Sequence, residues 1–161
     1  MVILGVDPGT AITGYGVVES RVAGLRAIAY GVIRTSADAP APERLAIIHR
    51  KVKAILSSNG VEHLATERLF LSHNEKTAFS VGRTIGVVLL AAAELGVHWQ
   101  EYTPLQVKQA VVGYGAADKQ QVQYMVQRIL DLDELPKPDD AADALAVAIC
   151  HAHMAATKGA E

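Results

Sequence analysis

Three places in the sequence put carboxylates at the end or the start of an apolar run. Asp7 follows the β-branched run 2–6 and precedes the turn Pro8-Gly9. Glu67 follows a short strand-like run, and Asp140 and Asp143 open an apolar stretch near the C-terminus. Ionising a carboxyl group against buried structure is costly unless a cation or hydrogen-bond donors compensate. These acids are therefore the first candidates for chemistry.

Each acid also has a plainer structural interpretation. Asp7 can accept hydrogen bonds from the backbone of the turn that follows it. Asp139 or Asp140 can cap the last predicted helix, because acids in a first turn complement the helix dipole. Capping explains Asp143 less well, since it stands about a turn inside the helix. Asp140 pairs with Asp143 at a spacing of three on one helix face, and Asp139 pairs with Asp143 at four as the alternative.

A metal site explains all of these positions together. Carboxylates gathered in a region of low dielectric repel each other unless cations hold them, and oxygen ligands favour Mg²⁺ or Mn²⁺. Two such ions about 4 Å apart can activate a water and stabilise the leaving oxygen of a phosphodiester. The acids therefore predict phosphoryl-transfer chemistry on a polyanion, with Asp7 bridging both ions.

The elements that would position these acids follow from hydrophobic periodicity and turn residues. The predicted strands cover residues 2–6, 13–19, 25–33, 61–66 and 97–102. The predicted helices run from 43 to a stop at 59–60, from 74 to 95, from 103 to an interruption at 113–115, from 118 to about 130, and from 139 to about 156. This order predicts one α/β domain over 1–156, with a mixed sheet flanked by helices and a flexible tail at 157–161.

Some residues predict local details of this fold. Thr103 and Asp118 are expected N-caps, the first before Pro104 at the first helical position and the second paired with Gln121 as in a capping box. Asn74 is the expected N-cap of the long helix that follows it. Glycines at 14 and 16 would let another element approach the second strand closely.

The predicted helix 74–95 is apolar on nearly every side over residues 85–93. One face should meet the sheet, so the opposite face needs another neighbour. That neighbour is either a second copy of the chain in a homodimer or a close contact at Gly82 and Gly86 within one chain.

Composition limits the class of protein. The chain has 161 residues, of which 50% are hydrophobic and 5% aromatic, as expected of helices packed on a sheet. The single cysteine, Cys150, excludes a disulfide framework and points to a reducing compartment, so the cytoplasm is expected. No signal peptide is visible, and no apolar run approaches the ~18 residues needed to span a membrane.

The net charge of -2 argues against a nucleic-acid binder unless the acids gather at a metal site. Without the four proposed ligands, 15 basic residues would face 13 acidic ones, and the balance becomes +2. Bound metal ions would shift the local charge further in the same direction.

Four motifs in register resemble the family of RuvC crossover junction endodeoxyribonucleases. They are Ile3-Leu-Gly-Val-Asp-Pro-Gly-Thr10 with Thr13-Gly-Tyr-Gly16, Glu67-Arg-Leu-Phe70, the segment from Gln106-Val-Lys-Gln109 through Gly113 to Lys119, and Asp140-Ala-Ala-Asp-Ala-Leu145. The likeness covers almost the whole chain. It implies an RNase H-like fold with a mixed five-stranded sheet, a homodimer, and Mg²⁺- or Mn²⁺-dependent nicking of two opposed strands of a four-way DNA junction. It also implies partnership with the RuvAB branch-migration motor.

The resemblance carries over to individual positions. The family's catalytic, metal-binding acids correspond to Asp7, Glu67, Asp140 and Asp143, although some relatives have a histidine in place of Asp140. Phe70 matches an aromatic that wedges against bases near the cut, with an ordinary core role as the alternative.

Basic residues of the chain extend the predicted DNA contact. Lys108 and Lys119 match basic residues near the scissile strand, where each could neutralise a phosphate. Lys76 and Arg83 lie in or near the start of the long predicted helix and could extend the same track.

Three other functions compete with a junction nuclease. A phosphate-binding ATPase of the actin and Hsp70 type shares the strand that ends in Asp-x-Gly-Thr, but it needs two related domains, and 161 residues supply one. A junction-binding protein without catalysis and a nuclease of the same fold that prefers RNA–DNA hybrids stay open.

Overall fold

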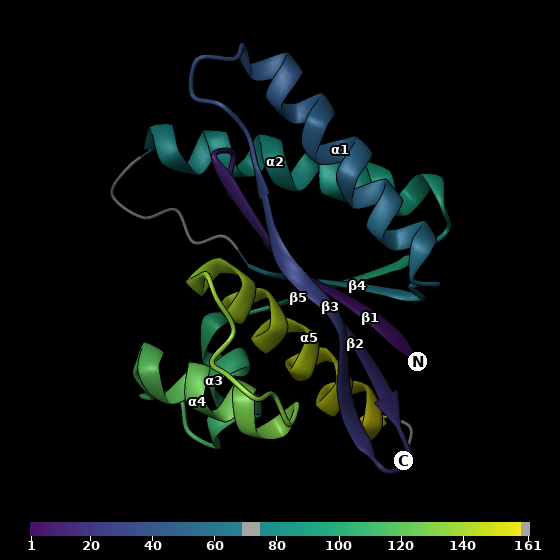
Figure 1. Cartoon of the computed structure of the whole chain (residues 1–161), viewed down its shortest axis with the longest axis vertical. Coiled ribbons are helices and arrows are strands. Elements are labelled where there is room, and N and C mark those ends of the chain that lie inside the picture. Colours follow the sequence, from purple (N-terminus) through teal and green to yellow (C-terminus); the bar gives the residue numbers. More distant parts are fainter. Residues whose placement is uncertain (69–74, 159–161) are drawn as a thin grey trace.

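The computed structural model describes residues 1–68 and 75–158, with side chains described within 1–68 and 78–156. A five-stranded sheet runs through the middle of the molecule in the order β3-β2-β1-β4-β5 (Figure 1). Its strands are β1 (Val2–Asp7), β2 (Ile12–Arg21), β3 (Gly24–Arg34), β4 (His63–Glu67) and β5 (His98–Tyr102). The first three form an antiparallel meander, and β4 and β5 run parallel to β1. The predicted mixed sheet is confirmed.

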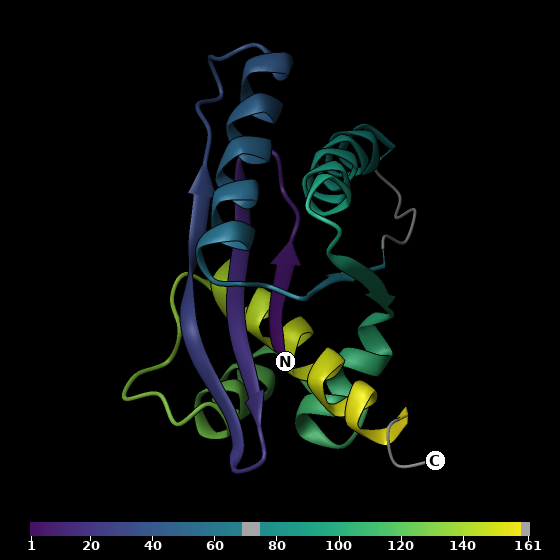
Figure 2. The ribbon, with the colours of Figure 1, turned by 90° about the vertical axis from the view of Figure 1, so that its right-hand side faces the viewer.

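Helices cover both faces of this sheet (Figures 1 and 2). One face packs against α1 (Ala41–Ser58) and α2 (Glu75–Glu94), and the other packs against α5 (Asp139–Lys158), with α3 (Pro104–Val112) and α4 (Lys119–Ile129) beside it. Side chains of β1 alternate between the two cores, so Ile3 faces α5 while Leu4 faces α1 and α2. The apolar run at the N-terminus is therefore a strand buried on both faces, as its composition predicts.

A row of glycines lets α5 lie flush against the sheet. A β-carbon at Gly5 would overlap the backbone of Ala144, and one at Gly14 would overlap the backbone of Asp140. At Gly16 it would collide with the side chain of Leu145. The close approach predicted at the second strand is thus confirmed, and it sets the first turns of α5 directly over β1 and β2.

The predicted caps of two helices are present. Thr103 accepts a hydrogen bond from the backbone N–H of Gln106, and Pro104 occupies the first helical position of α3. Asp118 and Gln121 form the reciprocal capping box of α4, with N···O distances of 2.8 and 2.9 Å. The predicted cap Asn74 lies outside the described residues.

Element boundaries differ from the sequence prediction where polar residues continue an element. Strand β2 continues to Arg21 and strand β3 begins at Gly24, because hairpin pairing continues past the apolar positions. Helix α1 begins at Ala41, since a proline is tolerated in a first helical turn. Helix α5 continues to Lys158, so the predicted tail 157–161 begins inside a helix. Within the described part of the chain, no helix is long and apolar enough to cross a membrane.

Candidate active site

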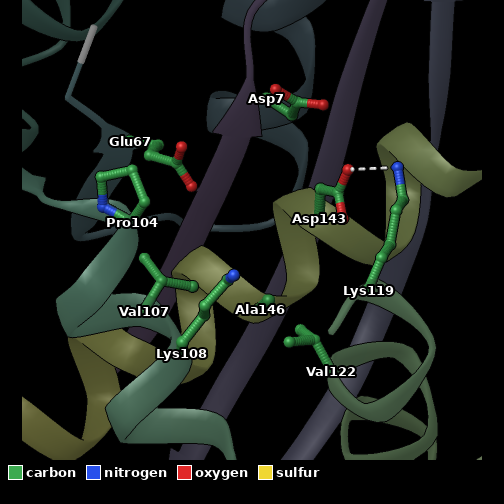
Figure 3. Close-up of a pocket in the computed structure, with 9 residues that line it drawn as sticks. All are labelled: Asp7, Glu67, Pro104, Val107, Lys108, Lys119, Val122, Asp143 and Ala146. Atoms are coloured by element: carbon green, nitrogen blue, oxygen red, sulfur yellow. Dashed lines mark hydrogen bonds and ion pairs between the residues drawn. The ribbon is translucent and has the colours of Figure 1, made fainter. Parts of the chain in front are cut away.

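Three elements bring carboxylates to one edge of the sheet. Asp7 ends β1 and Glu67 ends β4, and these two strands are parallel neighbours, with Val6 paired to Thr66. Their carboxyl ends therefore lie side by side. Asp143 comes from the second turn of α5, which the glycine row holds against the strands. All three side chains line one open cleft of about 250 Å³ (Figure 3).

The opposite wall of the cleft comes from α3 and α4. Lys108 and Lys119 reach into it, and the remaining lining is Pro104, Val107, Val122 and Ala146 (Figure 3). The two lysines were predicted to lie near the scissile strand. The apolar residues were not singled out from the sequence, although Val107 adjoins Lys108 and Ala146 lies one turn after Asp143.

Asp140 is not among the residues that line the cleft. Its backbone packs against Gly14, which is the register partner of Asp7 across β1 and β2. Asp140 is half-buried there, and its charge contributes to the pKa of Asp7. The structure thus brings Asp140 into the electrostatic neighbourhood of the other three acids.

Asp139 is exposed and contacts two side chains of α4. Its carboxylate lies 3.3 Å from Lys119 Nζ and accepts a hydrogen bond of 3.0 Å from Gln123 Nε2. These two groups, the Gln123 hydrogen bond foremost, lower the pKa of the exposed Asp139. Lys119 thus contacts both Asp139 and Asp143, whereas the charge that acts on Asp7 is that of Asp140 and not that of Asp139.

The carboxylates of the cleft repel one another in partly buried surroundings. Burial, followed by repulsion from Asp143, Asp140 and Glu67, raises the pKa of Asp7 from its ordinary 3.8 to about 7. Burial and then repulsion from Asp143 likewise raise the pKa of Glu67, while Lys108 lowers it. A group of acids whose charged forms are disfavoured in this way is stabilised by a cation.

Lys119 supplies part of that positive charge. Its Nζ donates a hydrogen bond of 3.1 Å to Asp143 Oδ2 (Figure 3). This bond lowers the pKa of Asp143, whereas burial, the larger effect, raises it. Neither Asp7 nor Glu67 has a comparable ion pair among the described residues.

A divalent cation fits the donor set of the cleft. All the candidate ligands are carboxylates, the oxygen donors that Mg²⁺ and Mn²⁺ prefer. As the side chains stand, no three His, Cys, Asp or Glu groups in the described residues converge on one ion position. Lys119 is bonded to one of the proposed ligands in this arrangement, so its amine and a cation would compete for Asp143.

Of the other predicted DNA contacts, Arg83 alone has a side chain within the described part of the chain. Arg83 is exposed on α2 and is not a lining residue. Lys76 belongs to α2, but its side chain lies outside the described part, and Phe70 lies outside the described residues altogether.

Comparisons with known proteins find similarity over nearly the whole chain. A family model described as crossover junction endodeoxyribonuclease RuvC matches residues 3–151. The crossover junction endodeoxyribonuclease RuvC of Desulfitobacterium hafniense is 56% identical over 153 residues, which cover 95% of this chain and 93% of that protein.

Two solved structures are similar over nearly the whole chain. The RuvC structure from Thermus thermophilus has a TM-score of 0.91 at 42% identity, covering 98% of this chain and 97% of that one. T. thermophilus RuvC in complex with a Holliday junction substrate has a TM-score of 0.90 at 40% identity, covering 98% and 96%. The RNase H-like fold implied by the motifs is confirmed, and this chain belongs to the RuvC family of crossover junction endodeoxyribonucleases.

Proposed function

We propose that this chain resolves four-way (Holliday) DNA junctions in homologous recombination and repair, by paired metal-dependent nicks in two opposed strands. One observation carries the proposal: Asp7, Glu67 and Asp143 come from three separate elements and line one cleft, with Asp140 held beside them at Gly14. The family membership supports the same reaction, and one solved relative is described as a complex with a Holliday junction substrate.

The proposed ligands are Asp7, Glu67, Asp140 and Asp143, which would hold two Mg²⁺ or Mn²⁺ ions with Asp7 shared between them. When bound, the ions would activate the attacking water and stabilise the leaving oxygen, giving a 5′-phosphate and a 3′-hydroxyl. Lys108 faces Glu67 across the cleft, where its ammonium can neutralise a phosphate of the cut strand (Figure 3). Lys119 also lines the cleft, and its ammonium can neutralise a second phosphate once a cation takes its place at Asp143.

Contact with the rest of the junction would extend beyond the cleft. We infer that Lys76 and Arg83, on α2, neutralise further phosphates and that Phe70 stacks on bases near the cut. Arg83 is exposed and has no ion pair with any described residue.

A homodimer would place two such clefts on one junction, whose opposed strands are related by a twofold axis. The outward face of α2 supports this assembly. Phe79 is 71% exposed and Leu90 is 52% exposed, at helical spacing along one stripe with Gly82 and Gly86. A β-carbon at either glycine would meet no atom of the described residues within 4 Å. The glycines are therefore open to a second copy, and the alternative of a close contact within one chain finds no support there.

The remaining assignments rest on family membership. We infer that residues 1–156 act as one nuclease domain, that the enzyme works with the RuvAB branch-migration complex, and that it acts in the cytoplasm.

The decisive variant is Asp7→Asn, assayed on four-way junctions in Mg²⁺. It should bind junctions with the affinity of the wild type and cut none, because one neutral amide replaces the shared carboxylate ligand. Comparison with RNA–DNA hybrids separates a junction resolvase from a hybrid-cutting nuclease of the same fold. Cleavage that survived Asp7→Asn would contradict the metal-site assignment, and a wild type that binds without cutting would support a non-catalytic binding protein.

A further inference from the structure

The loop that follows Asp7 is held mainly by hydroxyl groups. One backbone bond adds to them, from the Thr35 N–H to the carbonyl of Ala11 at 3.1 Å. The ladder between β1 and β2 ends at the pair of Asp7 with Gly14, so residues 8–11 have no strand partner. Thr13 Oγ1 donates to the carbonyl of Gly9 at 2.6 Å, and Thr35 Oγ1 donates to the carbonyl of Thr10, also at 2.6 Å. Side chains outside the loop therefore fix its backbone.

Among the described residues, the side chain of Thr10 alone forms hydrogen bonds between this loop and helix α2. Its Oγ1 lies 2.6 Å from Ser80 Oγ and 3.0 Å from Thr84 Oγ1, and it donates to the carbonyl of Ser80 at 3.1 Å. Thr84 is fully buried. We call Thr10, Ser80 and Thr84 the hydroxyl cluster.

Helix α2 does not need Thr10 in order to satisfy the hydroxyl of Thr84. Thr84 Oγ1 is also within 3.3 Å of the carbonyl of Ser80, a back-bond that hydroxyl residues commonly make inside helices. That bond satisfies Thr84 without any help from the loop. The additional contacts serve to hold Thr10, three residues beyond the carboxylate that the proposed reaction needs in a fixed place.

We propose that Thr10 is a positioning residue of the nuclease site: its hydroxyl, held by Ser80 and Thr84, fastens the loop after Asp7 to α2 and so fixes the direction of the Asp7 carboxylate. This inference rests on the proposed nuclease function. In this proposal Thr10 acts through the position of Asp7 and not by contact with the DNA. Its effect is on the rate of the cut rather than on junction binding, since a small misplacement of a reacting group costs rate far more than affinity.

The test compares Thr10→Val, which removes the hydroxyl and keeps the shape, with Thr10→Ser, which keeps the hydroxyl. The single-turnover cleavage rate at saturating junction should fall on the order of 10- to 100-fold in Thr10→Val, while the dissociation constant for the junction stays at the wild-type value. Thr10→Ser should recover most of the rate. The double variant Ser80→Ala/Thr84→Val removes both helix hydroxyls that contact Thr10 Oγ1 and should reproduce most of the loss, which keeps the test valid if Thr10→Val folds poorly.

A matched control is Asn59→Ala, which removes a side-chain hydrogen bond of 2.8 Å to Ile55 at the opposite end of the sheet from Asp7. It should lower stability without changing the cleavage rate. The inference is refuted if Thr10→Val cuts at the wild-type rate, if rate and affinity fall together, or if Thr10→Ser is as slow as Thr10→Val. A wild type that binds junctions without cutting would refute the nuclease function itself, which is a different result.

Discussion

Replacing Asp7 by Asn should make the protein more stable at about pH 8 when no divalent cation is present. The pKa of Asp7 is raised from 3.8 to about 7 by burial and by repulsion from Asp143, Asp140 and Glu67. A carboxyl with a raised pKa ionises in the unfolded chain before it ionises in the folded one. Folding stability is therefore lost progressively as the pH rises from about 4 to about 7, and an uncharged Asn avoids this loss.

The size of the effect follows from the shift in pKa. A difference of about 3 pKa units corresponds to about 4 kcal/mol, at about 1.4 kcal/mol per unit, and this is a ceiling. Asp7 is only half-buried, so solvent and salt screen the repulsion, and a gain of about 1–2 kcal/mol is expected. The gain should shrink as the pH falls below about 7 and vanish near pH 4, where the carboxyl is protonated in both states.

Urea unfolding in a chelating buffer at several pH values measures this difference. Asp139→Asn is the matched control, because the pKa of the exposed Asp139 is lowered by Gln123 and Lys119, so its loss should not stabilise the fold. Added Mg²⁺ should stabilise the wild type through binding to the folded state and stabilise Asp7→Asn much less. An Asp7→Asn variant no more stable than the wild type at about pH 8, or a gain that does not depend on pH, would refute the reasoning.

Three further changes test other parts of the structure. Gly14→Ala puts a methyl group into the backbone of Asp140, so it should cost about 1–3 kcal/mol in urea unfolding and abolish cleavage; wild-type activity would show that α5 need not lie flush. Lys108→Ala should weaken junction binding and reduce the magnitude of the slope of log affinity against log salt concentration by about 1. An unchanged slope would show that Lys108 does not contact a phosphate. If the proposed homodimer forms through α2, Leu90→Asp should make the protein monomeric in analytical ultracentrifugation and uncouple the two nicks, whereas a dimer that persists would place the interface elsewhere.

The sequence allowed the acids to be predicted because each stands at a break in the hydrophobic pattern. Asp7 and Glu67 end parallel neighbours, so strand order alone brings them together once β1 and β4 pair. The choice between Asp139 and Asp140 could not be made from spacing, since both share a helix face with Asp143. The structure adds that the Asp140 backbone lies against Gly14, and this contact depends on tertiary packing that spacing in the sequence does not show.

The hydroxyl cluster had no signal in the sequence. Thr10 is separated from Ser80 and Thr84 by some seventy residues, and serines and threonines are common in loops and helices alike. The bond between Lys119 and Asp143 was equally invisible, because Lys119 alone has the sequence character of an exposed residue. Both depend on how separate elements are brought together by the core.

We propose above that these carboxylates hold the metal ions with which the protein cuts two opposed strands of one junction. Four preparations of a mobile four-way junction, each labelled on a different strand, should be incubated with the wild type in Mg²⁺ and with Glu67→Gln as the comparison. The wild type should make symmetric nicks in two opposed strands, with 5′-phosphate and 3′-hydroxyl ends, and no nicks should appear with Glu67→Gln or in chelator. Nicks that persist in chelator, or a wild type that leaves every strand of a bound junction intact, would contradict it.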